Sequence, residues 1–284
     1  MDDPIATAPG SDTPRPQSPT KVGTLTPFLF RLAVLTAFLV LAPHTFGKTI
    51  RVMTYNIHVG IGMDKKLDLQ RIADVINKEK PDLVGLQEVD RGVQRTQRID
   101  EIVELSKLTR MEYAFAFNLP YQGGQYGVAI LSRFPIRATE HRLYKNLREA
   151  ERRGFIRAEV KIEGRVVNFV TTHLDYQHDD GRLFEAEQMP AFLSEVKGPL
   201  IVIGDFNDTP AGDTYKLMRS LFYDAWELRA AEDGFSYPAD KPAKRIDYIF
   251  TRRTDGIKTK RVWVVQTLAS DHIPVVADLE LRNP

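Results

Sequence analysis

The 284-residue chain contains no cysteine, and this absence excludes several kinds of functional site. Without a thiol there is no disulfide scaffold, cysteine-ligated zinc, iron–sulfur cluster or cysteine nucleophile. An excess of one charge is also missing, because 39 Lys and Arg face 38 Asp and Glu. That balance argues against a general nucleic-acid coat, which usually has a strongly cationic domain. The 43% of hydrophobic residues suit a globular core, so disorder of the whole chain is excluded.

The first 48 residues do not show the pattern of a folded domain. Residues 1–24 combine five prolines with Ser, Thr, Asp and Gly, which predicts a disordered leader. Residues 32–42 are an uncharged apolar run, shorter than the roughly 20 residues of a membrane span but as long as a signal-peptide core of about 7–15. Residues 25–48 are therefore predicted to be a signal peptide cleaved after Gly47, or a membrane anchor within 25–46. A buried helix of the domain is the alternative.

Export or anchoring predicts an extracytoplasmic protein, secreted or periplasmic, or one attached to a membrane through residues 25–46. Residues 49–284 are then expected to be one folded domain. The first 48 residues carry four basic and three acidic side chains, so this domain is formally neutral.

Short runs rich in Val and Ile, bounded by turn residues, predict buried strands in the folded part. They cover 50–57, 82–86, 128–131, 165–171, 200–203, 246–250 and 275–281. Apolar residues at helical spacing predict helices over 68–80, 97–110 and 181–195, with Asp68 as an N-cap and Pro81 closing the first helix. Strand–helix–strand stretches alternate with direct strand-to-strand connections, such as 153–160 into 166–170, which favours two packed sheets with helices outside.

Polar residues capable of chemistry follow most of these strands. They are Asn56, His58, Gln87, Glu88, Asp90, His173, Asp175, Asp205, Asn207, Asp208, Asp271 and His272. Ligands gather at strand carboxyl ends in α/β sheets, although each residue alone could be a turn former or a solvated strand end. Carboxylates, amides and imidazoles without a thiol together predict a hard, oxygen-rich site suited to Mg²⁺ or Mn²⁺.

Asp247 differs from the others because it lies inside the apolar segment IDYIF. A carboxylate buried in such a strand requires a partner. His272 or Arg245 could serve, and the sequence leaves both open.

Seven segments in order carry a family resemblance: TYNIH (54–58), LQEVD (86–90), YGVAILSR (126–133), THLD (172–175), GDFND (204–208), RIDYIF (245–250) and SDHIPV (270–275). Together they resemble the motifs of the endonuclease/exonuclease/phosphatase superfamily, over about residues 49–281. The resemblance implies a four-layer α/β/β/α sandwich, two packed mixed sheets flanked by helices. It also implies Mg²⁺-dependent hydrolysis of a phosphate ester.

The resemblance assigns a metal site to three of these residues. Glu88 matches the principal metal ligand of the family. Asn56 and Asp271 match residues that complete or support the metal site.

Five further residues match positions that act on water and phosphate. Asp205 matches the residue that orients or deprotonates the attacking water, and Asn207 the amide that holds this water and the phosphate. His272 matches the histidine at the scissile phosphate, with Asp247 as its carboxylate partner. His173 matches a histidine found in the nuclease, sphingomyelinase and 5-phosphatase branches but not in the apurinic endonucleases.

Additional substrate contacts are expected from residues near these motifs. His58 could contact phosphate or pack in a turn, while Tyr126 and Arg153 could reach the phosphate. Asp175 follows His173 as in small bacterial members of the family, with no role that the motif itself indicates.

Residues 130–165 hold ten Lys or Arg and five Glu, a local excess of +5. Such a rim would attract a polyanion or an anionic lipid surface. The alternative is a pair of solvated strands with alternating charges.

The predicted function is therefore Mg²⁺-dependent hydrolysis of a phosphodiester, in nucleic acid, a phospholipid head group or a small molecule. The alternatives are a phosphomonoesterase acting on inositol phosphates or nucleotides, and an inactive binding protein on the same scaffold. No obligate protein partner is evident from the sequence.

Overall fold

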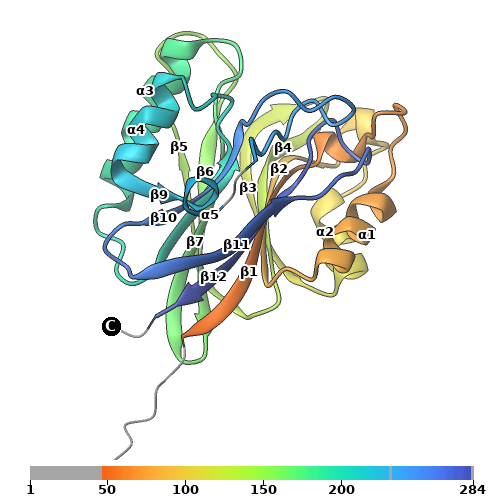
Figure 1. Ribbon diagram of the computed structural model, residues 1–284. Helices are drawn as coiled ribbons and strands as arrows, with labels where there is room; N and C mark the ends of the chain where they lie inside the picture. Colours follow the sequence, from red (N-terminus) through yellow and green to blue (C-terminus); the bar gives the residue numbers. More distant parts are fainter. Residues whose placement is uncertain (1–46, 230–231, 283–284) are drawn as a thin grey trace, which may run out of the picture. The chain divides into compact units, whose positions relative to one another are not determined.

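The computed structural model describes residues 47–229 and 232–282, in which two six-stranded sheets pack face to face (Figure 1). The first sheet contains, in spatial order, β11 (Ile257–Val264), β12 (Val275–Leu281), β1 (Lys48–Asn56), β2 (Leu83–Arg91), β4 (Gly124–Ser132) and β3 (Glu112–Tyr121). The second contains β5 (Ile136–Leu143), β6 (Gly154–Ile162), β7 (Arg165–His173), β8 (Leu200–Asp205), β10 (Asp247–Arg252) and β9 (Phe222–Asp224). Both sheets are mixed, because β1–β2 and β7–β8 are parallel and their other pairs antiparallel.

Helices cover the outer face of each sheet (Figure 1). On the first sheet lie α1 (Leu69–Glu79) and α2 (Glu101–Thr109), and on the second lie α3 (Asp179–Leu193) and α4 (Asp213–Leu221). The predicted four-layer α/β/β/α sandwich is confirmed. None of the helices in the described ranges is both long and apolar enough to cross a membrane.

Three apolar clusters hold these layers together. Side chains from both sheets, such as Ile130 and Ile203, fill the space between the sheets. Ile72 and Leu105 belong to the cluster under α1 and α2, while Met189 belongs to the cluster under α3 and α4. Each sheet is therefore buried on both faces, which explains why its central strands are continuous apolar runs.

The first helix begins and ends where the sequence predicts. The Asp68 side chain accepts a hydrogen bond from the backbone N–H of Arg71, as an N-cap does. Lys80 adopts a left-handed conformation that closes the helix directly before Pro81. The second predicted helix, over 97–110, begins later, at Glu101, because Gln94–Thr96 form a separate 3-10 turn and Gln97 and Arg98 have positive φ.

The sequence missed four strands and two helices. β5 is exposed along most of its length and β11 is only partly buried, so neither has the apolar run that marks a central strand. β3, β9, α4 and the short α5 (Ala225–Arg229) were missed as well. The strand predicted at 82–86 continues to Arg91, which places Glu88 within β2 rather than after it.

The leader predicted over residues 1–48 lies outside the described residues except for its last two. Lys48 is the first residue of β1, and its Cα pairs with that of Leu281 on β12. Disorder, export and anchoring remain predictions.

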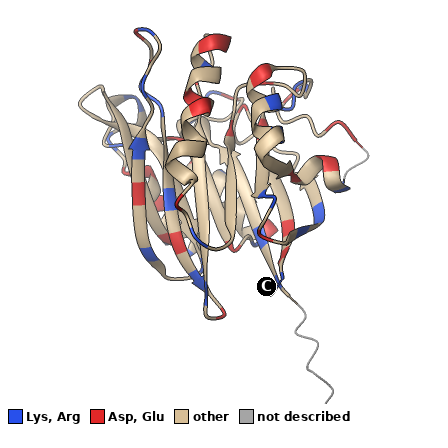
Figure 2. Cartoon of the chain, turned by 90° about the vertical axis from the view of Figure 1, so that its left-hand side faces the viewer, with Lys and Arg blue, Asp and Glu red and all other residues tan. Residues whose placement is uncertain are grey.

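The basic segment 130–165 is spread over β5, β6 and their connections, and basic and acidic residues alternate along the strands on this side of the molecule (Figure 2). Glu140 forms ion pairs with Arg142 and Arg157, and Arg157 also contacts Glu159. These paired charges match the solvated-strand alternative better than a continuous cationic rim.

Candidate active site

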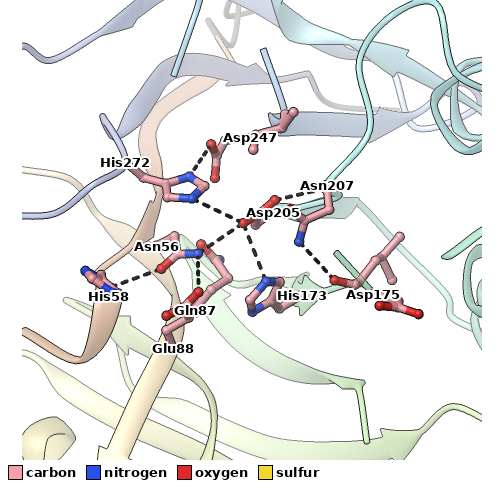
Figure 3. Close-up of polar contacts among 12 residues, drawn as sticks. Asn56, His58, Gln87, Glu88, His173, Asp175, Asp205, Asn207, Asp247 and His272 are labelled. Atoms are coloured by element: carbon pink, nitrogen blue, oxygen red, sulfur yellow. Dashed lines mark hydrogen bonds and ion pairs between the residues drawn. The ribbon is translucent and has the colours of Figure 1, made fainter. Parts of the chain in front are cut away.

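Five strands from the two sheets bring the predicted residues together at one edge of the sandwich. In the second sheet His173 pairs with Asp205 across β7 and β8, and Asp205 pairs with Asp247 across β8 and β10. In the first sheet Asn56 pairs with Gln87 across β1 and β2. The sheets therefore bring residues more than 100 positions apart into one group (Figure 3).

Gly204 allows the close approach that puts Asp205 beside His173. Its φ is +152°, and a Cβ there would lie 2.1 Å from the carbonyl oxygen of Thr172. A side chain would therefore push β8 away from β7 at the residue before Asp205.

Asp205 is the centre of the group and is 1% exposed. Its Oδ1 accepts the backbone N–H of Asn207 at 2.9 Å, and its Oδ2 accepts Nδ2 of Asn56 at 3.0 Å. Nε2 of His173 and Nε2 of His272 lie 3.5 and 3.6 Å from the same Oδ2 (Figure 3). Burial and the charge of Asp247 raise the pKa of Asp205 to about 7, although the positive charge of His272 opposes the shift.

His272 is held on its far side by Asp247, not by Arg245. Oδ2 of Asp247 accepts hydrogen bonds from Nδ1 of His272 at 2.9 Å and from Oγ of Ser236 at 2.6 Å. Burial lowers the pKa of His272, yet the carboxylates of Asp247 and Asp205 raise it to about 10. Arg245, the other partner that the sequence left open, instead forms an ion pair with Asp224.

His173 has the opposite surroundings. Its Nδ1 lies 2.6 Å from Nη1 of Arg153, a group that can only donate. Burial and the positive charges of Arg153 and His272 hold the pKa of His173 well below its usual value. The two histidines beside Asp205 thus differ in charge, one neutral and one protonated.

The predicted metal ligands lie on the first-sheet side of the group. Glu88 lies within a register irregularity in β2 and has φ of +56°, a left-handed conformation that costs energy for a non-glycine residue. Gln87 points between the sheets and donates to Thr171, whereas Glu88 lines the cavity. Asp271 lines the same cavity, so two carboxylates are available to a hard cation.

Asn56 contacts two carboxylates, those of Glu88 and Asp205, through its nitrogen. Its Nδ2 donates to Glu88 at 3.1 Å as well as to Asp205, and its Oδ1 accepts the backbone N–H of His58. The amide therefore orients the two carboxylates, and a contact of its oxygen with a metal would require the amide to rotate.

A cavity of about 630 Å³ opens over this group. Besides the residues above, its lining includes Asn207, Asp208, Thr209, Arg95, Tyr121, Tyr126, Glu151, Tyr176, Arg182, Tyr237 and Lys244. Asn207 has φ of +50° and donates through Nδ2 to the carbonyl oxygen of Leu174. Nine of the twelve predicted site residues belong to the cavity lining, in addition to the buried Asn56 and Asp247 behind it.

The four residues expected to contact substrate differ in their surroundings. Tyr126 and Arg153 are almost completely buried and line the cavity. His58 lines it too, while its Nδ1 contacts the carbonyl oxygen of Ile61, so it also holds its own turn. The Asp175 carboxylate faces the turn before α3, where it accepts from the backbone N–H of Gln177.

Sequence reasoning missed Ser236 and Tyr237. Ser236 donates to Asp247, and the ring of Tyr237 lies 4.8 Å from that of His272. Both belong to an irregular segment before β10 that has no periodic pattern. The buried Asp247 was the one available signal, because a carboxylate in a strand demands several donors.

Comparison with known proteins places the chain in a family. The model of the Endonuclease/Exonuclease/phosphatase family matches residues 53–272. The uncharacterized protein YbhP of Escherichia coli K12 is 25% identical over 250 residues, which cover 82% of this chain and 97% of YbhP.

Solved structures have the same fold. An endonuclease/exonuclease/phosphatase family protein from Bacteroides thetaiotaomicron has a TM-score of 0.69 at 19% identity, covering 83% of this chain and 96% of that one. A mannosyl-6-phosphatase from Bacteroides thetaiotaomicron VPI-5482 has a TM-score of 0.67 at 19% identity, covering 81% and 99%. The family match spans most of the chain and includes the segments that form the cavity. The chain belongs to the endonuclease/exonuclease/phosphatase family.

Proposed function

We propose that the chain is a divalent-metal-dependent hydrolase that cleaves a phosphodiester by attack of water. The observation that carries the proposal is the buried Asp205 carboxylate lying between the imidazoles of His173 and His272 at the base of a cavity. A base beside two imidazoles of different charge suits a reaction in which water loses a proton and an ester oxygen gains one.

Glu88 and Asp271 are the residues that we propose hold the metal, with Asn56 orienting Glu88. The donor set fits Mg²⁺, and Mn²⁺ as a second possibility, because both cations take carboxylate oxygens. Asp205, Asp247 and His272 also have ligand atoms within 4.8 Å of one another. We do not assign the metal there, because His272 and Asp247 use Nδ1 and Oδ2 on each other. When bound, Mg²⁺ supplies positive charge that neutralises and polarises the phosphate.

Asp205 in its ionised form takes the proton from the attacking water. Its elevated pKa makes it a better base than an ordinary aspartate while leaving much of it ionised at neutral pH. Asn207 is bound to Asp205 through its backbone N–H, so its side chain is held where it can align the water or a phosphoryl oxygen. The water oxygen forms the new bond to phosphorus.

His272 is the proposed acid. Its raised pKa keeps it protonated, and its Nε2 faces the same space as Asp205. As the bond from phosphorus to the ester oxygen breaks, His272 gives that oxygen its proton. Asp247 keeps the imidazole oriented and stabilises its charge.

A small phosphodiester is the substrate class that we favour over a polynucleotide. The folded part is formally neutral, and Arg142 on β5 and Arg157 on β6 are paired with glutamates. A polynucleotide-binding surface would be expected to present unpaired Lys and Arg to successive phosphates. Tyr121 and Tyr176, both exposed beside the cavity, offer aromatic surface for a ring-bearing group.

The test is release of p-nitrophenol from bis-p-nitrophenyl phosphate by the full chain. We expect turnover with Mg²⁺, loss with EDTA and recovery when Mg²⁺ is restored. A parallel panel of DNA, RNA, sphingomyelin, inositol phosphates and nucleotides ranks the substrate classes. Metal-dependent turnover confined to phosphomonoesters would replace the diester proposal, and no turnover of any phosphoester would refute the enzyme proposal.

A further inference from the structure

Arg153 and His173 form a buried contact that the sequence did not indicate. Arg153 precedes β6 and His173 ends β7, and the register of these strands places Gly154 opposite His173. This brings Nη1 of Arg153 to 2.6 Å from Nδ1 of His173. Both side chains are only 3% exposed, so water hardly competes for the contact.

The direction of this hydrogen bond determines where His173 carries its proton. A guanidinium has five N–H donors and no acceptor, so Nδ1 of His173 must accept with its lone pair. A neutral imidazole has a single N–H, which is then on Nε2. This Nε2 lies on the Asp205 side of the ring, where His173 lines the cavity.

The other two states of His173 conflict with Arg153. A proton on Nδ1 would set one N–H against another at 2.6 Å and remove the hydrogen bond. An imidazolium would have the same conflict and add repulsion between two buried positive charges. Glu151 holds Nη2 of Arg153 at 3.2 Å, which limits the freedom of the guanidinium to turn away.

His272 has the reverse constraint on the other side of Asp205. Its Nδ1 faces the carboxylate of Asp247, which accepts, so this nitrogen carries a proton. Two histidines that lie 3.5 and 3.6 Å from one oxygen are thus fixed from behind by groups of opposite polarity.

We propose that Arg153 is a positioning residue that holds His173 as the neutral Nε2–H tautomer. His173 then presents a hydrogen-bond donor to a phosphoryl oxygen and neither takes nor gives up a proton during turnover. The role toward phosphate rests on the proposed function, whereas the tautomer does not. Nη1 and Nη2 of Arg153 each carry a second N–H that these two contacts do not use.

Nuclear magnetic resonance of the full chain with ¹⁵N-labelled histidine and arginine tests the tautomer at neutral pH. The His173→Gln variant identifies the His173 signals. We expect an unprotonated Nδ1, a protonated Nε2 and a coupling across the hydrogen bond between Nη1 of Arg153 and Nδ1 of His173. A proton on Nδ1, or the absence of that coupling, overturns the proposal even if no Arg153 variant folds.

Three substitutions then test whether Arg153 is the cause. In Arg153→Met a proton should populate Nδ1 of His173, whereas Arg153→Lys, which keeps a donor, should retain the wild-type tautomer. Arg152→Met is the matched control, because Arg152 is exposed and its loss should leave the His173 signals unchanged. A folded Arg153→Met chain with His173 still entirely in the Nε2–H form would also overturn the proposal.

Kinetics separate this inference from the proposed function. With bis-p-nitrophenyl phosphate and Mg²⁺, Arg153→Met should lower kcat by about 10- to 100-fold, with most of the loss restored in Arg153→Lys. An equal loss in both variants, with the tautomer kept in the Lys variant, would contradict the assigned role of Arg153. If the wild type has no metal-dependent activity, the proposed function fails while the spectra still decide the tautomer.

Discussion

Asp247 accepts a hydrogen bond from His272 at 2.9 Å in a place where each side chain is at most 7% exposed. The pair joins the first residue of β10 to the segment before β12, so it exists only when the two sheets are packed together. It connects the fold directly to the proposed chemistry, because Nε2 of the same imidazole faces Asp205.

Replacing Asp247 with Asn should therefore damage activity more than stability. The amide keeps the size of the side chain but removes the negative charge that keeps His272 protonated. We expect kcat for bis-p-nitrophenyl phosphate to fall on the order of 100-fold, the lower end for loss of general acid catalysis. Steady-state kinetics with circular dichroism as the folding check measures this, and a folded variant with wild-type kcat would show that Asp247 is not the functional partner.

The pH dependence of kcat/KM should be bell-shaped. The reaction requires Asp205 ionised, so the rate rises with pH through its pKa of about 7, and it requires His272 protonated, so the rate falls through about 10. A bound divalent cation favours ionised carboxylates, so raising the Mg²⁺ concentration should move the acidic limb to lower pH. In Asp247→Asn the alkaline limb should move to lower pH. A pH-independent profile between 5 and 11 would contradict both assignments.

Glu88→Gln should weaken metal binding with little change in the fold. The substitution removes a charged ligand while keeping the shape, so we expect the Mg²⁺ concentration for half-maximal activity to rise by at least about tenfold. Calorimetric titration with Mn²⁺ measures binding independently of turnover. Glu187→Gln, at an exposed position on α3, is the control and should bind as the wild type does. Equal Mn²⁺ affinity in all three proteins would remove Glu88 from the metal site.

Arg245→Met should lower stability and leave activity almost unchanged, the reverse of what we expect for Asp247→Asn. Arg245 and Asp224 form a buried ion pair, and removing the cation leaves a carboxylate uncompensated, at a cost of about 3–5 kcal/mol. Urea denaturation should show this loss, while kcat per folded molecule stays close to wild type. Arg219→Met, which breaks an exposed pair with Glu227, should cost less than about 1 kcal/mol. If Arg245→Met instead abolished kcat in a fully folded protein, our assignment of a structural role to Asp224 and a functional role to Asp247 would be wrong.

The sequence predicted the layers, and the edge at which the polar residues gather, because both depend on local, repeated signals. Central strands such as β7 and β8 are buried along most of their length, and they end at His173 and Asp205. Edge strands such as β5 are exposed to solvent on one or both faces. Their sequences therefore contain many polar residues and cannot be told apart from loops. The family resemblance supplied the roles, which the residues alone left open.

Partner choice within the site could not be predicted, because it depends on side-chain geometry across the fold. Arg245 is two residues from Asp247 in sequence but pairs with Asp224, while His272 comes from 25 residues further on. Ser236, in an irregular segment, gave no pattern to read. The left-handed backbone at Glu88 has the same origin, since packing around the site rather than local preference holds it.

The most direct test of the account is the metal-dependent rate of Asp205→Asn beside wild type. Hydrolysis of bis-p-nitrophenyl phosphate would be followed in saturating Mg²⁺, with Asp213→Asn, an exposed aspartate at the start of α4, as the control. We predict that Asp205→Asn folds, binds Mn²⁺ and loses about 10²- to 10⁴-fold in kcat, while Asp213→Asn matches the wild type. A folded Asp205→Asn enzyme with wild-type kcat would contradict the account.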